Sequence, residues 1–270
     1  MATRKFQRGT ELIKQAAESK GGGRRFTPNI FWKPGDVKTI AFATEAEQIP
    51  KVLVHQVVRI PDDRFDSGFR IENIICKKDP SMIEEFGGSC ELCDEVKHDA
   101  TERFVALAVE LEPIKDGKKV TGLKVKTNRA KNKDGVETDY PQWGLVMQAS
   151  SNFFSYFAAY SDAGNDIREV GWEIQREGGS RDTKYHPFIV MNGPNAVALP
   201  DLSEVLENVP SLDELLEGMA SEEKYAEVAG LDPGTQISFG GKNKTAESGT
   251  VPSGDRQTEF ERIREELNAY

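Results

Sequence analysis

Every cysteine of the chain lies within one stretch, Cys76-Lys77-Lys78-Asp79-Pro80-Ser81-Met82-Ile83-Glu84-Glu85-Phe86-Gly87-Gly88-Ser89-Cys90-Glu91-Leu92-Cys93. Cys90 and Cys93 form a C-x2-C knuckle, a spacing that lets two thiolates reach one tetrahedral metal ion from a tight turn. Cys76 follows an expected strand and supplies a third thiolate. Three thiolates leave a tetrahedral zinc ion one ligand short, so this stretch predicts a structural Cys3His zinc site.

The fourth ligand must come from one of three histidines, His55, His98 or His186. His98 follows Cys93 in a helical-looking run, at a spacing that places it on a poor face for the same ion. His55 lies in the apolar run 51–59, which predicts a strand that can hold an imidazole rigidly against the knuckle. We therefore favour His55 and keep His98 as the alternative. The competing interpretation makes Cys76 a buried apolar thiol and His55 a core histidine.

Charge is segregated along the 270 residues, whose formal net charge is −10. Residues 201–270 hold 16 acidic and 6 basic side chains, whereas residues 1–25 hold seven basic and two acidic ones. A basic arm, a balanced body and an acidic end indicate an anionic partner at one end of the chain and a partner-binding tail at the other.

Targeting signals are not evident in the sequence. No apolar run reaches the length of a membrane span, and the N-terminus lacks a secretory apolar core. An odd number of cysteines, three, argues against a disulfide framework and for a reducing compartment. We expect a cytoplasmic protein with no membrane partner.

The body of the chain reads as short antiparallel strands. Alternating patterns cover residues 103–111 and 119–127, and Asp116-Gly117 between them predicts a hairpin turn. Residues 143–160 are helical in character, with an aromatic core stripe at Phe153, Phe157 and Tyr160. These patterns predict a mainly β (α+β) fold, an OB-type Greek-key barrel with an inserted zinc-binding subdomain.

The expected organisation has four parts. A basic N-terminal arm covers residues 1–25, and the OB-fold core covers 26–200 with the zinc subdomain at about 55–102. Ser211 and Glu214 form a capping box that opens a helix in the acidic segment 201–229. Residues 230–270 have the composition of a disordered linker followed by an acidic tail.

No catalytic constellation stands out in the sequence. The chain has no G-x-S-x-G elbow, P-loop, H-E-x-x-H or dinucleotide fingerprint, and its carboxylates form no acid–base pattern. A catalytic zinc is disfavoured because no Glu-adjacent histidine pair supplies an open coordination position and a general base. We therefore expect a protein that is not an enzyme.

The positive signal for binding is the interleaving of basic and aromatic residues. A groove for single-stranded nucleic acid needs both, because cations follow the phosphates and aromatic faces stack unpaired bases. About half of the candidates are expected in the core, whereas alternation places Lys124 and Lys126 outside. The candidates are Trp32, Lys33, Arg59, Arg64, Phe65, Phe69, Arg70, Arg103, Phe104, Lys124, Lys126, Arg129, Tyr140 and Trp143.

The order of His55, Cys76 and Cys90-Glu91-Leu92-Cys93, followed by Glu112-Pro113, resembles the single-stranded DNA-binding proteins of T4-like phages. The piece Phe31-Trp32-Lys33-Pro34-Gly35 is similar to that family's entry into its core. The resemblance covers about residues 30–190. The spacers between His55 and Cys76 and between Cys76 and Cys90 are longer here than in the family.

The resemblance implies an OB-fold core, one structural zinc ion and the ligand set His55, Cys76, Cys90 and Cys93. It also implies protomer contacts on DNA through a basic arm and recruitment of replication and recombination proteins by the acidic tail. The expected arm residues are Arg4, Lys5 and Arg8. The expected tail contacts are Phe260, Ile263 and Leu267, which share one helical stripe.

The function predicted in this way is sequence-nonspecific binding and protection of single-stranded DNA in phage DNA replication, recombination and repair. A zinc-ribbon adaptor that binds proteins is one alternative, and a metal-dependent nuclease is another. RNA stays a possible ligand, because nothing in the sequence reads a 2′-hydroxyl group.

Overall fold

A computed structural model of the chain describes residues 28–62, 67–131, 137–148, 151–179, 183–231 and 236. The chain divides into two units, Met1–Phe239 and Gly240–Tyr270. Every described residue belongs to the first unit.

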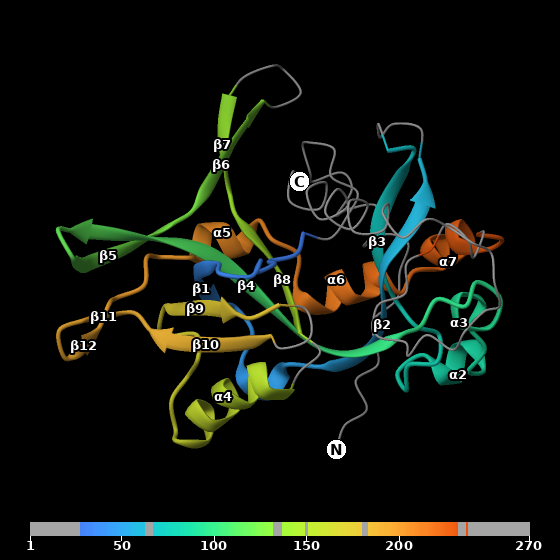
Figure 1. Cartoon of the computed structure of the whole chain (residues 1–270), viewed down its shortest axis with the longest axis horizontal. Coiled ribbons are helices and arrows are strands. Elements are labelled where there is room, and N and C mark those ends of the chain that lie inside the picture. The colour runs from blue at the N-terminus through green and yellow to red at the C-terminus, as the bar shows by residue number, and fades with distance from the viewer. Residues whose placement is uncertain are drawn as a thin grey trace. The chain divides into compact units, whose positions relative to one another are not determined.

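The sheet is built around one long strand, β4 (Thr101–Asp116), of 16 residues. One edge of β4 pairs with β2 (Lys51–Pro61) and then with β1 (Val37–Phe42), while the opposite edge pairs with β8 (Trp143–Gln148) and then with β5 (Lys119–Val125). All four pairings are antiparallel. A single strand therefore connects both halves of the fold, as its path across Figure 1 shows.

The remaining strands extend this arrangement outward. β9 (Trp172–Glu177) pairs with β1, β10 (Lys184–Ile189) pairs with β9, and β3 (Phe69–Ile75) pairs with β2. Two small hairpins stand apart from the eight-stranded sheet: β6 (Thr127–Lys131) with β7 (Glu137–Pro141), and β11 (Met191–Asn192) with β12 (Asn195–Ala196). The expected mainly β fold with an antiparallel sheet is confirmed.

The helices, most of them short, are the 3-10 helix η1 (Ala46–Gln48) and the α-helices α2 (Ile83–Phe86), α3 (Glu91–Asp94), α4 (Ser151–Asp162), α5 (Ser203–Glu207), α6 (Leu212–Met219) and α7 (Glu222–Val228). In Figure 1 α4 lies below the sheet, α2, α3 and α7 lie at the right, and α5 and α6 lie over the middle of the view. The predicted capping box is present at the start of α6, where Ser211 and Glu214 cap each other's backbone N–H groups. Among the described residues, no helix is long and apolar enough to cross a membrane.

The prediction of a helix over residues 143–160 is wrong for residues 143–148. Residues 143–148 form β8, which pairs with β4 from Phe104↔Gln148 to Val109↔Trp143. Helix α4 begins only at Ser151. The apolar run of β8 is buried on both faces of the sheet, and periodicity alone cannot distinguish such a run from a buried helix.

Both faces of β4 are covered. Val105 and Leu107 belong to one buried cluster, while Ala106 and Ala108 on the other face belong to a second. The second cluster includes Phe153 and Phe157 of α4, which confirms the predicted aromatic core stripe. Alanine on that face of β4 leaves room for the α4 rings to approach the sheet.

The helices beyond residue 200 share a core with the cysteine-rich stretch. Leu216, Met219 and Tyr225 are buried in the same cluster as Cys76 and Cys90. The Tyr225 hydroxyl donates a hydrogen bond to the Ile75 carbonyl at 3.0 Å. The expected acidic helical segment 201–229 is therefore packed into the first unit rather than standing apart from it.

One residue of the expected linker 230–270 is also placed. The side-chain oxygen of Gln236 accepts a hydrogen bond from the Arg59 N–H at 2.9 Å, and its side-chain nitrogen donates one to the Arg59 carbonyl at 3.0 Å. The Gln236 side chain therefore satisfies both backbone groups of Arg59, as the backbone of a neighbouring strand would.

Replacing Leu216, which is 1 % exposed, with alanine is expected to lower the free energy of unfolding by about 2–5 kcal/mol, because the cavity sits in the shared core. Urea denaturation followed by circular dichroism measures this change. The control Glu223→Ala, on the exposed side of α7, is expected within about 0.5 kcal/mol of wild type. An unchanged stability for Leu216→Ala would contradict the packing of the C-terminal helices onto the core.

Candidate metal centre and nucleic-acid interface

Four side chains converge at the junction of β2, β3 and the cysteine knuckle. The ligand atoms of His55, Cys76, Cys90 and Cys93 all lie within 4.8 Å of one another. The distance from His55 Nε2 is 3.3 Å to Cys90 Sγ and 3.7 Å to Cys93 Sγ, and Cys76 Sγ lies 3.6 Å from Cys93 Sγ. A tetrahedral zinc ion with Zn–S bonds of about 2.3 Å requires ligand separations of roughly 3.8 Å or slightly less. The four atoms therefore stand at the spacing of a tetrahedral metal site.

A bulge in β2 aims His55 at the cysteines. The pairing of β2 with β3 shifts between His55 and Val58, and Val57 adopts a left-handed backbone with φ of 60°. This conformation is strained for a β-branched residue, and such strain persists only where the surroundings fix it. The Val57 N–H donates to Asn73 Oδ1 at 3.2 Å, which satisfies the backbone group that the bulge frees.

The loop after Cys76 is fixed by the buried carboxylate of Asp79. Asp79 accepts hydrogen bonds from the Leu53 N–H at 2.6 Å and from the N–H and hydroxyl of Ser81 at 2.9 and 2.6 Å. The Lys78 N–H donates to Cys76 Sγ at 3.4 Å. Asp79 thereby ties the first cysteine loop to β2, the strand that carries His55.

The Cys90 knuckle is shaped by two glycines and one acid. Gly87 and Gly88 have φ of 62° and 74°, values that favour glycine, and they turn the chain just ahead of the knuckle. The Cys90 N–H donates to Asp94 Oδ2 at 3.1 Å, and Lys78 Nζ pairs with Asp94 Oδ1 at 2.6 Å. Asp94 therefore links the two cysteine loops.

The electrostatics of the cluster suit a cation. A hydrogen bond donated by Cys76, with a further contribution from His55, lowers the pKa of Cys90 to about 3. Donation to Cys90 and burial raise the pKa of Cys76, and burial raises the pKa of Cys93. Without a metal the crowded sulfurs oppose full ionisation, whereas a divalent cation stabilises all three thiolates together.

The histidine that joins the three cysteines in the cluster is His55 rather than His98. The His98 ring lies edge-on against the His55 ring, with centroids 5.5 Å apart, and is not one of the four converging residues. Both histidines are buried. Three sulfur donors and one imidazole nitrogen make up this cluster, which could hold a metal ion.

Several predicted contact residues lie outside the described residues. They are Arg64 and Phe65 of the expected groove, Arg4, Lys5 and Arg8 of the arm, and Phe260, Ile263 and Leu267 of the tail.

Two predicted DNA contacts have their polar groups engaged within the fold. Trp32 is 3 % exposed, and its indole donates a hydrogen bond to the Ile174 carbonyl at 3.0 Å, so it has no free face for a base. The Arg70 guanidinium is paired with Asp62, Glu72 and Glu227. Three carboxylates therefore already balance the charge of Arg70, and the Trp32 indole is held in the core.

Four further candidates are partly buried. The Arg59 guanidinium lies 4.6 Å from the centroid of the Phe69 ring and covers it. Phe104 packs against Phe154 with centroids 5.8 Å apart, and Trp143 packs against two core clusters. The Phe104 and Trp143 rings therefore pack against core side chains, and the Phe69 ring is covered by Arg59.

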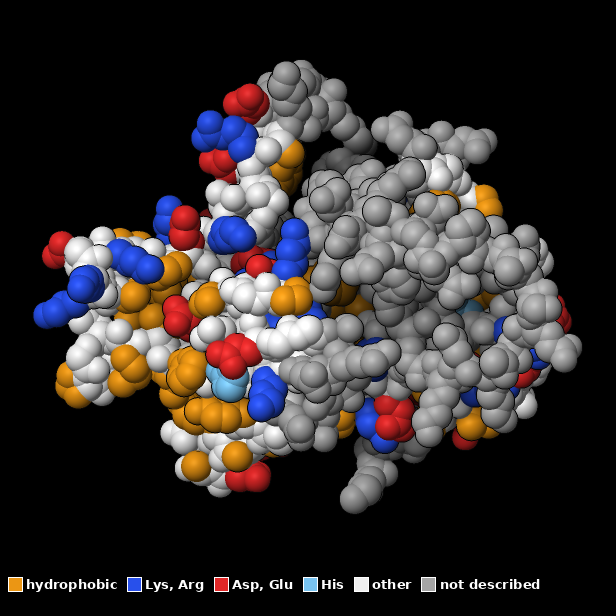
Figure 2. All heavy atoms as spheres, viewed as in Figure 1, with side chains coloured by type: hydrophobic (Ala, Val, Ile, Leu, Met, Phe, Trp, Pro, Cys, Tyr) orange, Lys and Arg blue, Asp and Glu red, His pale blue; other side chains and the backbone are white. Residues whose placement is uncertain are grey.

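The exposed candidates gather on β5, β6 and β7. Lys124 is 60 % exposed, Lys126 43 % and Arg129 68 % in their side chains, and Tyr140 is 37 % exposed. The cations pair with Glu112, Glu110 and Asp139, respectively. In Figure 2, blue and red side chains lie close together in the upper left of the view, where Figure 1 draws the β6–β7 hairpin and β5. Lys33, outside this group, is also exposed.

Sequence reasoning missed Arg176 and Tyr185, which face each other across β9 and β10. The Arg176 guanidinium donates to the Trp32 carbonyl and, at 3.2 Å, to Thr183 Oγ1. Both residues sit on strands, and nothing in their local pattern distinguishes them from ordinary surface positions. Only their contacts in the folded chain distinguish these two residues from other strand positions.

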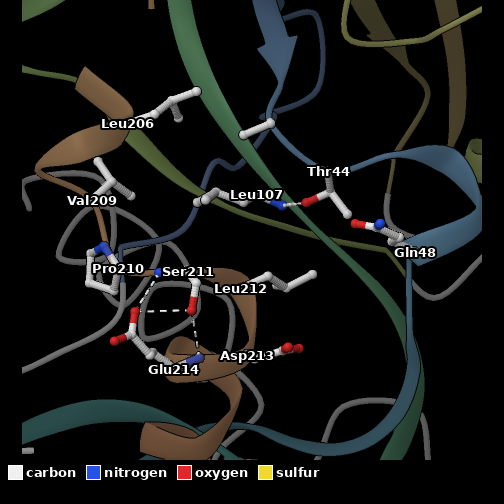
Figure 3. Close-up of a pocket in the computed structure, with 11 residues that line it drawn as sticks. Thr44, Gln48, Leu107, Leu206, Val209, Pro210, Ser211, Leu212, Asp213 and Glu214 are labelled. Atoms are coloured by element: carbon white, nitrogen blue, oxygen red, sulfur yellow. Dashed lines mark hydrogen bonds between the residues drawn. The ribbon is translucent and has the colours of Figure 1, made fainter. Parts of the chain in front are cut away.

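A separate hollow of about 470 Å³ opens between β1, β4 and the α5–α6 connection. Figure 3 shows Leu107, Val209 and Leu212 lining it, with Asp213 and Glu214 at its rim. The Glu214 carboxylate accepts the Ser211 N–H at 2.7 Å as part of the capping box. An acidic rim repels phosphate, so this hollow is a poor candidate for the DNA groove.

His55→Asn and Cys90→Ser are each expected to reduce the zinc content of the purified chain from one ion to a small fraction of one, because each removes a ligand of a tetrahedral site. Mass-spectrometric metal analysis of the full chain measures the content. His98→Asn is the matched control and is expected to retain the ion. Loss of zinc only in the His98 variant would assign the fourth ligand to His98 instead.

Comparisons of the chain with protein-family models, with curated proteins and with solved structures found no match.

Proposed function

We propose that the chain binds single-stranded DNA without sequence preference and protects it during phage DNA replication, recombination and repair in the bacterial cytoplasm. The observation that carries the proposal is the set of exposed cations Lys124, Lys126 and Arg129 together with the exposed ring of Tyr140, all between β5 and the β6–β7 hairpin. Cations that follow the backbone beside rings that stack bases are the ingredients of a sequence-tolerant strand-binding surface.

The ion pairs of these cations do not oppose the proposal. Exposed pairs such as Lys124 with Glu112, 2.9 Å apart, typically contribute about 0–1 kcal/mol, so a phosphate can replace the carboxylate at little cost. Arg129 and Tyr140 stand on the β6–β7 hairpin, where Asn128↔Tyr140 and Arg129↔Asp139 are neighbouring register pairs. Because successive positions of a strand alternate between faces, Arg129 and Tyr140 lie on opposite faces of the hairpin, so a bound strand that meets both would pass around its edge.

Zinc is the metal we propose for the four-ligand cluster, in a structural role. Three thiolates and one imidazole are a typical structural zinc donor set, and a closed set leaves no position for a reacting water. The metal would hold the β2 bulge against the two cysteine loops. We accordingly propose a binding protein rather than an enzyme.

We also propose an OB-type barrel as the finer description of the fold. Its support is the central strand β4, which exchanges partners along both edges, as a strand of a curled Greek-key sheet would. The basic arm would contact neighbouring protomers on DNA, and the acidic tail would recruit replication and recombination proteins. Both of these roles rest on the sequence resemblance and on charge segregation.

A fluorescence titration with single- and double-stranded oligonucleotides at two salt concentrations tests the proposal. We expect preference for the single strand and affinity that falls steeply with salt. Tyr140→Ala is expected to weaken binding by about 1–3 kcal/mol, the range for one stacked base. The control Phe188→Ala removes an exposed ring from β10 and is expected to leave affinity unchanged. Weak binding that does not respond to salt would favour the zinc-ribbon adaptor.

A further inference from the structure

The hollow between β1, β4 and the α5–α6 connection combines an apolar lining with a polar rim. Leu107 of β4 is 6 % exposed, and the half-buried Leu206, Val209 and Leu212 lie around it (Figure 3). With a volume of about 470 Å³, the hollow is large enough for an aromatic side chain. An apolar side chain that entered it would be removed from water, which favours binding.

The carboxylates near this hollow lack cationic partners. Residues 201–214 carry five acidic side chains and no lysine or arginine. Glu204, Glu207 and Asp213 are exposed, and none of them forms an ion pair with another residue in the described part of the chain. A concave surface bordered by one sign of charge attracts the opposite sign. The chemistry that fits the hollow is therefore an apolar side chain flanked by cations.

The N-terminal segment of the chain has this chemistry. Phe6 stands in the run Arg4-Lys5-Phe6-Gln7-Arg8, where three cations surround one large apolar side chain. Residues 1–25 as a whole hold seven basic and two acidic side chains. These residues lie outside the described part of the chain, and their chemistry follows from the sequence. The segment is thus complementary to the hollow in both apolar character and charge.

The described chain begins close to the hollow. The Pro28 carbonyl accepts a hydrogen bond from the Leu145 N–H at 2.8 Å. Leu145 is the register partner of Leu107, which lines the hollow. Neighbouring strands lie about 4.8 Å apart, so the backbone at Pro28 is roughly 10 Å from that of Leu107. Residues 7–27, if extended, span at most about 70 Å, so their length lets Phe6 reach the hollow of its own chain.

We propose that residues 4–8 dock in the hollow of the same chain, with Phe6 as the apolar anchor and the flanking cations beside the unpaired carboxylates. A docked segment is withheld from other partners, so this contact is autoinhibitory: an anionic ligand or a neighbouring protomer must displace it to reach the cations of the arm. The inference goes beyond the proposed function and does not depend on DNA binding.

The test uses a fluorescein-labelled peptide of residues 1–12, whose binding to the full chain is measured by fluorescence anisotropy. In wild type the tethered segment competes at an effective concentration in the millimolar range, whereas Phe6→Ser in the full chain leaves the hollow open. The peptide is therefore expected to bind the Phe6→Ser chain roughly tenfold more tightly than wild type. The same peptide carrying Phe6→Ser keeps its charges and is expected not to bind.

A change in the rim locates the peptide. Asp213→Asn, added to the Phe6→Ser chain, is expected to weaken peptide binding about two- to fivefold, the effect of losing one exposed ion pair. Glu223→Gln makes the same change of charge on the exposed side of α7, away from the hollow, and is the matched control. It is expected to leave the affinity unchanged.

Sedimentation velocity of wild type and of Phe6→Ser distinguishes the chain's own segment from that of a second copy. We expect both to be monomers over the concentrations tested. A wild-type dimer that Phe6→Ser abolishes would place the segment in a second copy and overturn the intrachain contact. Equal peptide affinities for wild type and Phe6→Ser, or no binding to either, would overturn the docking itself. No arm of the test uses DNA, so its failure leaves the proposed function standing.

Discussion

The convergence of one imidazole and three thiols is the constraint on which the cysteine-rich half of the molecule depends. The ligand atoms lie within 4.8 Å of one another although their residues come from β2, the end of β3 and the α3 knuckle. Helices α2 and α3, of four residues each, are too short to be stable alone. Their position is fixed by the cluster and by the carboxylates of Asp79 and Asp94, which bond the backbone around it.

The same region anchors the C-terminal helices. The Tyr225 hydroxyl of α7 donates a hydrogen bond to the Ile75 carbonyl. The Tyr225 ring packs against Phe86 with centroids 5.1 Å apart, and Lys77 Nζ lies 4.7 Å from the centroid of the Tyr225 ring. Ile75 and Lys77 flank Cys76. These contacts join the cysteine cluster to α7, so we expect the stability of the cluster and the docking of α7 to be coupled.

Local chemistry is predictable from the sequence, whereas long-range partnership is not. The C-x2-C spacing, the glycine turn and the capping box at Ser211 depend on neighbours in the chain, and each is present. The burial of Trp32 depends on Ile174, and the acid cluster around Arg70 includes Glu227, so no local pattern reveals either. The strand at 143–148 resembles a helix in sequence because both of its faces are covered, which removes the period-two signal.

X-ray absorption at the zinc edge of the purified full chain tests the central claim most directly, because it reports the identity and shell of the bound ion together. We predict one zinc ion per chain with three sulfur neighbours at about 2.3 Å and one nitrogen neighbour at about 2.0–2.1 Å. A folded chain that carries no zinc, or a zinc shell made of oxygen and nitrogen alone, would contradict it.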